Sequence, residues 1–405
     1  MIVNLWQNVE YLGGGNIECI GTMEVDCDAI ISSALIHYND TFNMLYNVEW
    51  SDIDYNVAMN ELSSKNIGFD FENNKSKLPR MKKDKLKQLY IASILTHNYG
   101  DISLANKVKI PTEIDLFTYS SPCQSFSIAG KQAGLSGTSG LLLECEKFIE
   151  LNKPKFLLLE NVKNLVGKKF IKDFENWLKI LDKLGYNSYW TILNAKDFNV
   201  PQNRERVFCL SVRKDIDKGY EFPIGNGINK CIQDILDDNV DNKYYLRQEI
   251  VDKFVVRPIG DNIIGTTAPE KTIGQRDIVY KPNGIMGTLT ATDYKQPKQI
   301  IVLGDIDKKG WFDVEKRVYD KIGLSPTLTT NASGSPKIVH SLHDKFTIRK
   351  LTPKECWRLM DFDSNAFDKV KQYISDTQLY KQAGNSIVVA CLEHIFLNLK
   401  KQYNL

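Results

Sequence analysis

Short apolar runs typical of β-strands alternate with longer amphipathic runs from about residue 16 to residue 225. The strand-like runs are Ile17–Met23, Ile114–Tyr119, Lys155–Leu159, Tyr186–Leu193 and Val207–Val212. The amphipathic runs, with apolar residues three and four positions apart, are Asp28–Tyr38, Gly140–Leu151 and Ile171–Leu184. Because this alternation is typical of βαβ units, the sequence predicts an α/β fold around a mostly parallel sheet.

The pattern changes after this region. Residues 226–345 are rich in turns, Thr, Gly and Pro, and residues 346–405 return to helical patterning. The segment Gly284–Thr290 is echoed by Gly323–Thr329, which indicates paired β-elements of one domain, since a solenoid needs at least about three repeats. We therefore expect residues 1–225 and 346–405 to form one domain, and residues 226–345 to form a small, irregular β-rich domain.

The region Ser51–Asn98 is polar and rich in lysine. We interpret it as a solvated helical insertion, and the alternative is a face that contacts phosphate groups. The formal net charge of +2 does not choose between them, because a nucleic acid responds to a local basic face and not to the sum over the chain.

Composition excludes several classes of protein. With 405 residues, of which 42% are hydrophobic and 25% charged, the chain has room for about two or three globular domains. Its apolar runs are far shorter than the roughly 20 residues needed to cross a bilayer, and no basic-then-apolar leader is found. The eight cysteines are scattered, without CxxC pairs or zinc-type Cys/His clusters. We expect a soluble, cytoplasmic monomer with reduced thiols, no membrane segment and no metal.

Cys123 is the one cysteine whose context suggests chemistry. It lies in Ser120–Ser127, just past the carboxyl end of an expected parallel strand, and ligands bind at this edge of open α/β sheets. Pro122 stiffens the approach, and Gln124 and Ser125 offer hydrogen-bonding groups. A cysteine in such a loop is otherwise a packing residue, so its position alone leaves both interpretations open.

Two further candidates follow the same topology. The apolar run Lys155–Leu159 ends in Glu160, which places a carboxylate at the same sheet edge, where desolvation can raise the pKa of an acid toward neutrality. Arg204 and Arg206 precede the last strand and point to one face if the segment is extended, so both could address one anion or carbonyl. The ordinary alternatives are a surface glutamate at a strand end and two solvated arginines paired with Glu205.

These groups together suit one kind of reaction. A thiolate is a strong nucleophile toward an electron-poor ring carbon, a protonated glutamate can donate to a ring nitrogen, and an arginine can hold a ring carbonyl. Each group would lower a different part of one barrier.

The same residues resemble the motifs of the cytosine-C5 DNA methyltransferases, and the resemblance covers most of the chain. Pro122–Ser127 is similar to the family's nucleophile loop, Glu160–Val162 to its acid motif and Gln202–Arg206 to its Gln-x-Arg-x-Arg motif. Ala383–Ile387 resembles the C-terminal cofactor motif, and the four occur in the family's order. The resemblance implies a Rossmann-like, S-adenosylmethionine-dependent methyltransferase fold in which residues 226–345 form the target-recognition domain.

The resemblance also assigns roles in catalysis. Cys123 would attack C6 of a flipped-out cytosine while Glu160 contacts N3, C5 would then take a methyl group from S-adenosylmethionine, and a base would remove the C5 proton. Arg206 would hold the cytosine carbonyl, with Arg204 supporting the loop. The family extrudes the base because C5 and C6 cannot be reached from both faces inside a stacked duplex.

Contacts with double-stranded DNA are implied as well. Gln124, Ser125 and Ser127 would line the phosphate and the vacated base stack. The Thr-rich turns around Thr290 and Thr329 could offer donors and acceptors in the grooves, or they could only cap turns. We expect the DNA to lie between the two domains.

Cofactor residues follow from two shorter motifs. Glu24, with Val25 beside it, follows an expected strand and resembles the family's second motif, whose acid binds the ribose hydroxyls. Gly100–Ile102 resembles the next motif, in which Asp101 accepts from the adenine amino group and Ile102 packs on the ring. Further cofactor contacts are expected from Leu142, Asn385 and Ser386.

The sequence departs from the family near its start. The family's Phe-x-Gly-x-Gly turn is expected about 20 residues before the ribose-binding acid, which projects to about residue 4, yet Met1–Trp6 contains no glycine. A start further upstream, a lost first strand and a substitute strand at Met1–Leu5 all remain open. We predict weak binding of S-adenosylmethionine. The alternative functions are a degenerate, weakly active or inactive DNA-binding relative and a tRNA cytosine-C5 methyltransferase, although the long segment 226–345 favours DNA.

Overall fold

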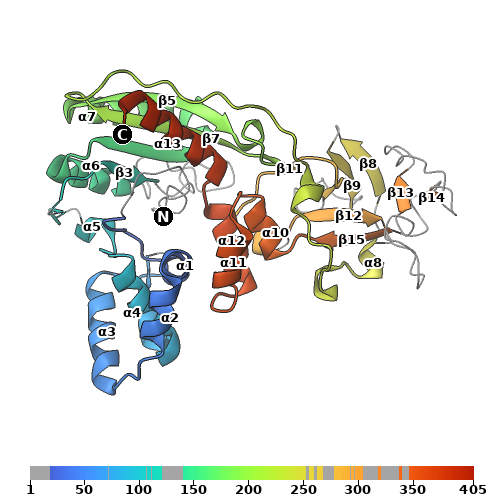
Figure 1. Ribbon diagram of the computed structural model, residues 1–405, viewed down its shortest axis with the longest axis horizontal. Helices are drawn as coiled ribbons and strands as arrows, with labels where there is room; N and C mark the ends of the chain where they lie inside the picture. The colour runs from blue at the N-terminus through green and yellow to red at the C-terminus, as the bar shows by residue number, and fades with distance from the viewer. Residues whose placement is uncertain are drawn as a thin grey trace.

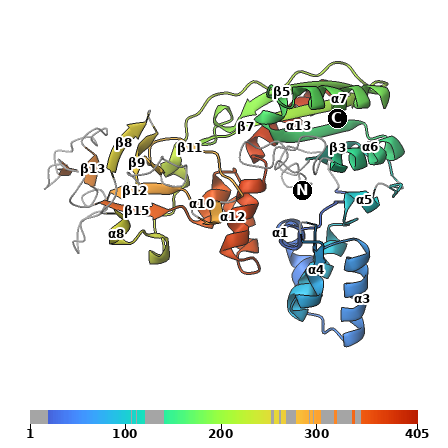
Figure 2. The same cartoon turned by 180° about the vertical axis from the view of Figure 1, so that it is seen from behind.

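The computed structural model describes residues 19–71, 73–105, 107–110, 112–120, 140–251, 255–259, 262–267, 278–291, 293–295, 297–303, 318–320, 337–339 and 346–405. Within these residues three bodies can be distinguished (Figure 1): a sheet flanked by helices, a group of helices from the early part of the chain, and a second sheet. Helices α10, α11 and α12 lie between the two sheets, and the view from behind shows the same arrangement (Figure 2).

The helices and strands have the following bounds. The α-helices are α1 (Cys27–His37), α2 (Asn39–Tyr46), α3 (Asp52–Ser64), α4 (Lys83–Leu95), α5 (Ile102–Ala105), α6 (Gly140–Asn152), α7 (Ile171–Lys183), α8 (Gln248–Val251), α10 (Pro353–Arg358), α11 (Ser364–Val370), α12 (Asp376–Asn385) and α13 (Val389–Tyr403). The strands are β1 (Phe69–Asp70), β2 (Lys75–Ser76), β3 (Leu116–Tyr119), β4 (Phe156–Val162), β5 (Tyr186–Asn194), β6 (Gln202–Asn203), β7 (Glu205–Arg213), β8 (Val255–Ile259), β9 (Ile263–Thr266), β10 (Ile278–Tyr280), β11 (Met286–Gly287), β12 (Gln299–Leu303), β13 (Val318–Asp320), β14 (Lys337–Val339) and β15 (Phe346–Lys350). Short 3₁₀ turns include η7 (Ile232–Ile235) and η9 (Asp293–Lys295).

The first sheet confirms the α/β prediction and corrects its strand directions. Its order is β3-β4-β7-β5, and four of the predicted strands form it. Strands β3 and β4 are parallel, but β7 runs antiparallel to both β4 and β5, so the described sheet is mixed and not mostly parallel. The reason is the connection between β5 and β7, residues 195–204, which is too short to hold the crossover helix that a parallel neighbour requires.

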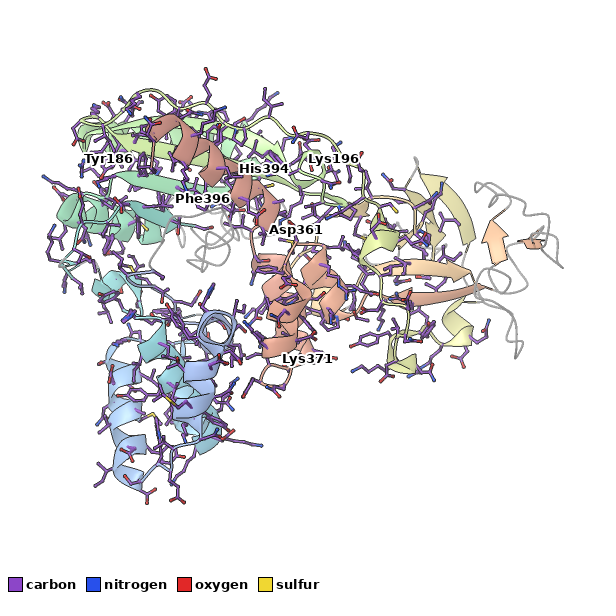
Figure 3. All side chains as sticks on the ribbon, viewed as in Figure 1. Tyr186, Lys196, Asp361, Lys371, His394 and Phe396 are labelled. Atoms are coloured by element: carbon purple, nitrogen blue, oxygen red, sulfur yellow. The ribbon has the colours of Figure 1, made fainter. Side chains whose placement is uncertain are left out.

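Both faces of this sheet are covered by helices, as the unbroken apolar runs of β4 and β7 require. Alternate residues point to opposite faces. Phe156, Leu158 and Leu210 pack in one cluster with α13, while Leu157, Leu159 and Cys209 pack in another with α6 and α7. Two aromatic residues visible in Figure 3 follow this division: Phe396 of α13 belongs to the first cluster and Tyr186 of β5 to the second. Each such buried Leu or Phe contributes about 1.5–3 kcal/mol.

The group of early helices comprises α1, α2, α3 and α4. Helix α1 begins one residue before the predicted position, because Asp26 accepts from the N–H groups of Asp28 and Ala29 and so caps its N-terminus. The predicted strand Ile17–Met23 is not found in its described part, residues 19–23, where a single bridge joins Thr22 to Asn98. The region Ser51–Asn98 is largely helical, as predicted. Its phosphate-contacting alternative stays a prediction.

The second sheet has the order β15-β12-β10-β9-β8. Its strand β15 begins at Phe346, where the first domain was expected to resume, and pairs antiparallel with β12 over five residue pairs. In the opposite direction, β11 pairs with β6 of the first domain and Leu289 enters the core shared with α12 and α13. Strand β15, expected in the first domain, therefore belongs to the second sheet, and the segment around β11, expected in the second domain, packs against the first.

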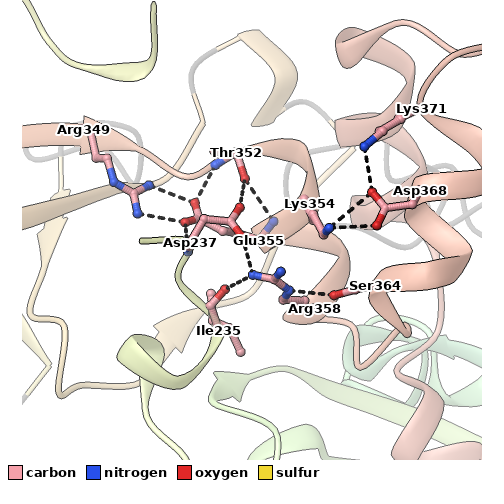
Figure 4. Close-up of polar contacts among 10 residues, drawn as sticks. All are labelled: Ile235, Asp237, Arg349, Thr352, Lys354, Glu355, Arg358, Ser364, Asp368 and Lys371. Carbon is pink, nitrogen blue, oxygen red and sulfur yellow. Dashed lines mark hydrogen bonds and ion pairs between the residues drawn. The ribbon is translucent and has the colours of Figure 1, made fainter. Parts of the chain in front are cut away.

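A buried polar network joins the second sheet to the central helices (Figure 4). Arg349 of β15 donates from Nη1 and Nη2 to the two oxygens of Glu355 in α10, each at 2.8 Å. Glu355 also accepts from the backbone N–H of Thr352 at 2.7 Å and of Asp237 at 2.9 Å. Arg358 donates to Asp237 Oδ1 at 2.8 Å. Asp237 lies in the segment by which the chain leaves the first domain, and Arg349 in the segment by which it returns. The network therefore connects these two segments.

The described residues also bear on membrane helices, metal-binding groups and the state of the cysteines. No helix among them has the length and apolar character to cross a membrane, and no group of three or more His, Cys, Asp or Glu side chains there could hold a metal ion. The described cysteines are free thiols, and burial raises the pKa of Cys145 and Cys209 to about 12. Cys356 and Cys391 are also buried, so these four thiols lie in the core.

Candidate active site

Glu160 lies inside a paired strand at the edge predicted to carry the chemistry. Strand β4 continues two residues beyond Glu160, which faces Phe208 of β7 in the ladder. Ser120 is the first residue after β3, and its hydroxyl donates to Glu160 Oε2 at 3.4 Å. The chain thus passes the carboxylate immediately before it enters residues 121–139, which include Cys123 and lie outside the described residues.

Arg206 completes a pair with this carboxylate. Its Nε lies 3.2 Å from Glu160 Oε1, and the two side chains are 15% and 9% exposed. Its Nη1 donates to the carbonyl of Glu205 at 2.8 Å, which fixes the guanidinium. Burial raises the pKa of Glu160 above its usual range, and the positive charges of Arg206 and Arg204 oppose that rise. An acid of this kind can hold a proton closer to neutral pH than a surface glutamate can.

Arg204 is directed elsewhere. It is 3% exposed and donates to three backbone carbonyls: Leu289 at 2.8 Å, Gly384 at 3.1 Å and Ser386 at 2.8 Å. The expectation that both arginines address one anion is therefore not met by these contacts, because residues 203–205 do not continue as one extended strand. Through these contacts Arg204 holds the end of α12 and the segment around Leu289 in place.

Glu24 and Val25 form the first half of the expected cofactor site. Glu24 is 6% exposed, and its Oε1 accepts from the N–H groups of Val25 at 2.8 Å and Asp26 at 2.9 Å, which fixes the carboxylate. Burial raises the pKa of Glu24 above its usual range. The nearby Asp26 accepts from Lys381 at 3.3 Å, so α12 reaches this segment.

Asp101 and Ile102 form the second half. Asn98 links the two halves: its Oδ1 accepts from the N–H groups of Glu24 at 3.3 Å and Gly100 at 2.7 Å, and its Nδ2 donates to the Glu24 carbonyl at 3.1 Å. Gly100 has a φ of +79°, and a Cβ there would lie 2.1 Å from the Lys65 carbonyl oxygen. Only glycine fits this turn, which brings Asp101 beside the Glu24 segment.

The remaining cofactor candidates surround these acids. Ile102 and Leu142 are both buried in one apolar cluster with Met23, so the expected apolar contacts come together. Asn385 is partly buried at the end of α12, and the Ser386 hydroxyl donates to Ala383 while its carbonyl accepts from Arg204. Glu24, Asp101, Ile102 and Leu142 thus gather in one region, to which α12 is attached through Lys381 and Asp26.

The DNA-contact candidates are less completely described. Gln124, Ser125, Ser127 and Thr329 lie outside the described residues. The Thr290 hydroxyl donates to Asp293 Oδ1 at 2.6 Å and its N–H donates to Asp293 Oδ2 at 3.0 Å. This is the turn-capping arrangement that the sequence left open, and in it the hydroxyl proton is directed to Asp293. A role for Thr290 toward DNA stays a prediction.

The sequence analysis did not identify three buried polar residues, two near this site and one in the network between the second sheet and the central helices. Asn98 has no motif signal beyond lying two positions before Gly100. Gln202 lies in the quoted arginine motif, where only the arginines were given roles, yet it is fully buried, donates to the Leu359 carbonyl at 2.7 Å and accepts from the Leu289 N–H at 3.1 Å. Glu355 could have been found from Thr352–Glu355, a Thr-x-x-Glu capping-box pattern before a helix.

Comparison with known proteins decides the family. The family model for C-5 cytosine-specific DNA methylase matches residues 60–401. This chain belongs to the C-5 cytosine-specific DNA methylase family. It is 35% identical over 390 residues to the type II methyltransferase M2.ScrFI of Lactococcus lactis subsp. cremoris, covering 95% of this chain and 92% of that one.

One further relative and one solved structure are also similar to this chain. The orphan methyltransferase M.Rho11sI of Bacillus phage rho11s is 30% identical, covering 76% of this chain and 88% of that one. The solved structure of the Entamoeba histolytica methyltransferase EhMeth covers 77% of this chain and 86% of that one, with 17% identity and a TM-score of 0.48. The predicted membership of the family is confirmed by the family model and by M2.ScrFI.

Proposed function

We propose that this chain is a DNA (cytosine-5-)-methyltransferase that transfers a methyl group from S-adenosylmethionine to C5 of a flipped-out cytosine in a specific double-stranded DNA sequence. The observation that carries the proposal is the pair of Glu160 and Arg206 at 3.2 Å, buried at the sheet edge, with Ser120 of the Cys123 segment against the same carboxylate. Family membership supports the reaction, and the geometry supports the division of roles.

Each residue then contributes one part of the reaction. The Cys123 thiolate adds to C6, and the electron pair of the C5–C6 double bond becomes available at C5. Glu160, whose pKa is raised by burial, holds a proton at N3 and so accommodates the charge that the ring gains. Arg206 holds the ring carbonyl. After C5 has been methylated, a base removes its proton, the double bond re-forms and the Cys123 sulfur leaves.

The residues around Glu24 and Asp101 fit S-adenosylmethionine. Glu24 offers a fixed carboxylate for ribose hydroxyls, Asp101 offers an acceptor for an amino group, and Ile102 and Leu142 offer apolar surface. When bound, the cofactor supplies an electrophilic methyl group. These side chains orient it, and Asn385 and Ser386 would contact it from the end of α12.

The substrate is proposed to be DNA and not tRNA. Gln124, Ser125 and Ser127 would hold the phosphate and the vacated stack, and the sheet β15-β12-β10-β9-β8 would form the core of the target-recognition domain. The names of the relatives, a type II methyltransferase and an orphan phage methyltransferase, favour a role in a restriction-modification system or as a solitary enzyme.

Trapping the covalent intermediate tests the proposal. Wild-type protein, incubated with cofactor and DNA that contains 5-fluorocytosine at the target site, should form an adduct that survives denaturing electrophoresis. Cys123→Ala should form none and should still bind the DNA, whereas the control Cys231→Ala, a thiol outside this edge, should react like the wild type. An adduct with Cys123→Ala would contradict the proposed nucleophile, and methyl transfer to tRNA but not to duplex DNA would contradict the substrate.

The alternative expected from the sequence, a DNA-binding relative with weak or no activity, stays a prediction. Calorimetric titration with S-adenosylmethionine separates the two. Binding in the ordinary micromolar range would contradict this alternative, and binding that remains unsaturated at millimolar cofactor would support it.

A further inference from the structure

The turn after α3 touches the expected cofactor site. Helix α3 ends at Ser64, and Asn66 follows with a φ of +55°, a left-handed conformation that asparagine tolerates better than most residues. The N–H of Asp101 donates to the Lys65 carbonyl at 2.9 Å. At the end of this turn, the N–H of Gly68 donates to the Val25 carbonyl at 2.9 Å. The segment Lys65–Gly68 is therefore bonded to the backbone beside both expected cofactor acids.

Asn66 also reaches the Asp101 carboxylate directly. Its Nδ2 donates to Asp101 Oδ2 at 3.1 Å. The same carboxylate accepts from the Ser103 N–H at 3.0 Å through Oδ1 and from the Ser103 hydroxyl at 2.8 Å through Oδ2. The Ser103 bonds are local, two residues along the chain, and hold the carboxylate toward α5. Asn66 is 35 residues away in sequence and fixes the carboxylate from the other side.

Burial makes this arrangement consequential. Asp101 is 6% exposed, so water can replace Asn66 only with difficulty. A carboxylate has acceptors only, and donors on two sides restrict its rotation and leave its remaining lone pair in a fixed direction. A fixed acceptor distinguishes an amino group, which donates, from a carbonyl oxygen, which does not.

We propose that Asn66 is a positioning residue for recognition of the adenine amino group, acting through Asp101. The inference rests on the proposed function, in which Asp101 accepts from that amino group. It adds that the inserted helices α3 and α4, through the turn Lys65–Gly68, form part of the support of the cofactor site.

Binding of two nucleosides that differ at one group tests the inference. S-adenosylhomocysteine carries the 6-amino group, and S-inosylhomocysteine carries a carbonyl oxygen in its place. Isothermal titration of the full chain should show that Asn66→Gly, which tolerates the left-handed turn, weakens binding of S-adenosylhomocysteine about 3- to 10-fold and leaves that of S-inosylhomocysteine within about twofold. The preference for the amino group should fall by the same factor.

Matched variants complete the experiment. Asn74→Gly removes an exposed asparagine that also has a positive φ, +48°, in the β1–β2 turn, and should change neither affinity. Asn66→Asp keeps the size of the side chain, places a carboxylate against Asp101 and should reduce the preference at least as much as Asn66→Gly. Melting of each apo protein within about 3 °C of the wild type establishes that it is folded.

The outcomes separate this inference from the proposed function. Equal weakening of both nucleosides by Asn66→Gly, or no effect on either, would overturn a positioning role while leaving the cofactor assignment intact. Failure of the wild type to bind S-adenosylhomocysteine, or failure of Asp101→Asn to reduce the preference for it, would overturn the cofactor assignment and the inference together.

Discussion

Two buried Glu–Arg pairs in this molecule contain the same residue types and are built differently. At the junction of the two sheets, Arg349 and Glu355 make two bonds of 2.8 Å and are 3% and 0% exposed. At the edge of the first sheet, a single Nε of Arg206 lies 3.2 Å from Glu160, and the side chains are 15% and 9% exposed. The Ser120 hydroxyl donates to the other Glu160 oxygen at 3.4 Å.

The difference lies in the number and length of the hydrogen bonds that each buried carboxylate receives. Glu355 receives two guanidinium and two backbone donors, which compensate its loss of water. Glu160 is buried with longer contacts, and its pKa is raised. The bonds of Glu355 hold together the two segments that connect the domains. The fewer and longer contacts of Glu160 leave a carboxyl group that can exchange a proton with a ring.

Removing the charge of Glu160 should give the largest effect on activity. Glu160→Gln is expected to lower kcat/KM by about 10²- to 10⁴-fold, because amide hydrogens cannot serve as the proton donor to the ring. Its stability at pH 7 should equal or exceed that of the wild type. The raised pKa of Glu160 means that its stabilising contribution is present below about pH 4.5 and is lost as pH rises through the folded-state value. Methyl transfer kinetics and urea denaturation measure the two effects.

The control for Glu160→Gln is Glu205→Gln on the neighbouring strand β7. Glu205 pairs with Lys163 at the surface, 2.9 Å away, and its loss should leave both activity and stability nearly unchanged. Full activity of Glu160→Gln would contradict the chemical role of this pair.

Removing Glu355 should give the largest effect on stability. Glu355→Ala is expected to lower the free energy of unfolding by about 3–5 kcal/mol, because it leaves Arg349 and two backbone donors buried without their acceptor. Urea denaturation followed by fluorescence measures this loss. Glu249→Ala, at an exposed first-turn glutamate of α8, should change stability by less than about 0.5 kcal/mol. A loss from Glu355→Ala no larger than that of this control would show that the junction does not depend on the pair.

A third acid, Asp361, sharpens the comparison because its side chain is only partly buried, 31% exposed, and its ion-pair partner Lys230 is 4.0 Å away. It lies near His394, in the turn between α10 and α11 (Figure 3), and partial removal from water raises its pKa to about 6. Its stabilising contribution is therefore complete below about pH 4 and is lost as pH rises through 6. Asp361→Asn should be about 1–2 kcal/mol more stable than the wild type at pH 8, and the difference should vanish near pH 4.

Urea midpoints measured from pH 4 to pH 8 check this dependence. Asn also suits the left-handed φ of +63° at this position, an effect that does not vary with pH. Asp363→Asn is the control, since asparagine caps α11 as well as aspartate does. A pH-independent difference would contradict a raised pKa for Asp361.

The smallest effect is expected from the cap inside the junction network. Thr352→Ala removes the bond from the Glu355 N–H to the Thr352 hydroxyl, 3.1 Å long, and should cost about 1 kcal/mol. Because Thr352 also donates its own N–H to Glu355, the double variant Thr352→Ala/Glu355→Ala should lose less than the sum of the single losses. Thr377→Ala, at an exposed position of α12, serves as the control in the same urea titrations. Additive losses would mean that the cap and the ion pair act independently.

The elements that hold the candidate site followed from periodicity. Strands β3, β4, β5 and β7 and helices α1, α6 and α7 were predicted to within a few residues, because long apolar patterns must be buried whatever the rest of the chain does. The direction of β7 was wrong, since parallel and antiparallel neighbours show the same apolar run. The predicted strand Ile17–Met23 has only one bridge in its described part, because an apolar run forms a strand only where a partner pairs with it.

The residue types of the site were readable from the sequence, and their partners were not. Arg204 meets Gly384, 180 residues away, and Asn66 meets Asp101 across an inserted helix. A strand end marks Glu160 and a capping-box pattern marks Glu355, but neither pattern shows that the pKa of one is raised and that the other closes a network.

The sequence by itself determined which residues carry reactive or ionisable groups and which runs must be buried, because side-chain chemistry and periodicity are local properties. Only the tertiary structure decided how many donors surround each buried carboxylate. That number sets the balance between desolvation and compensation, and it depends on packing between segments that lie far apart in the chain.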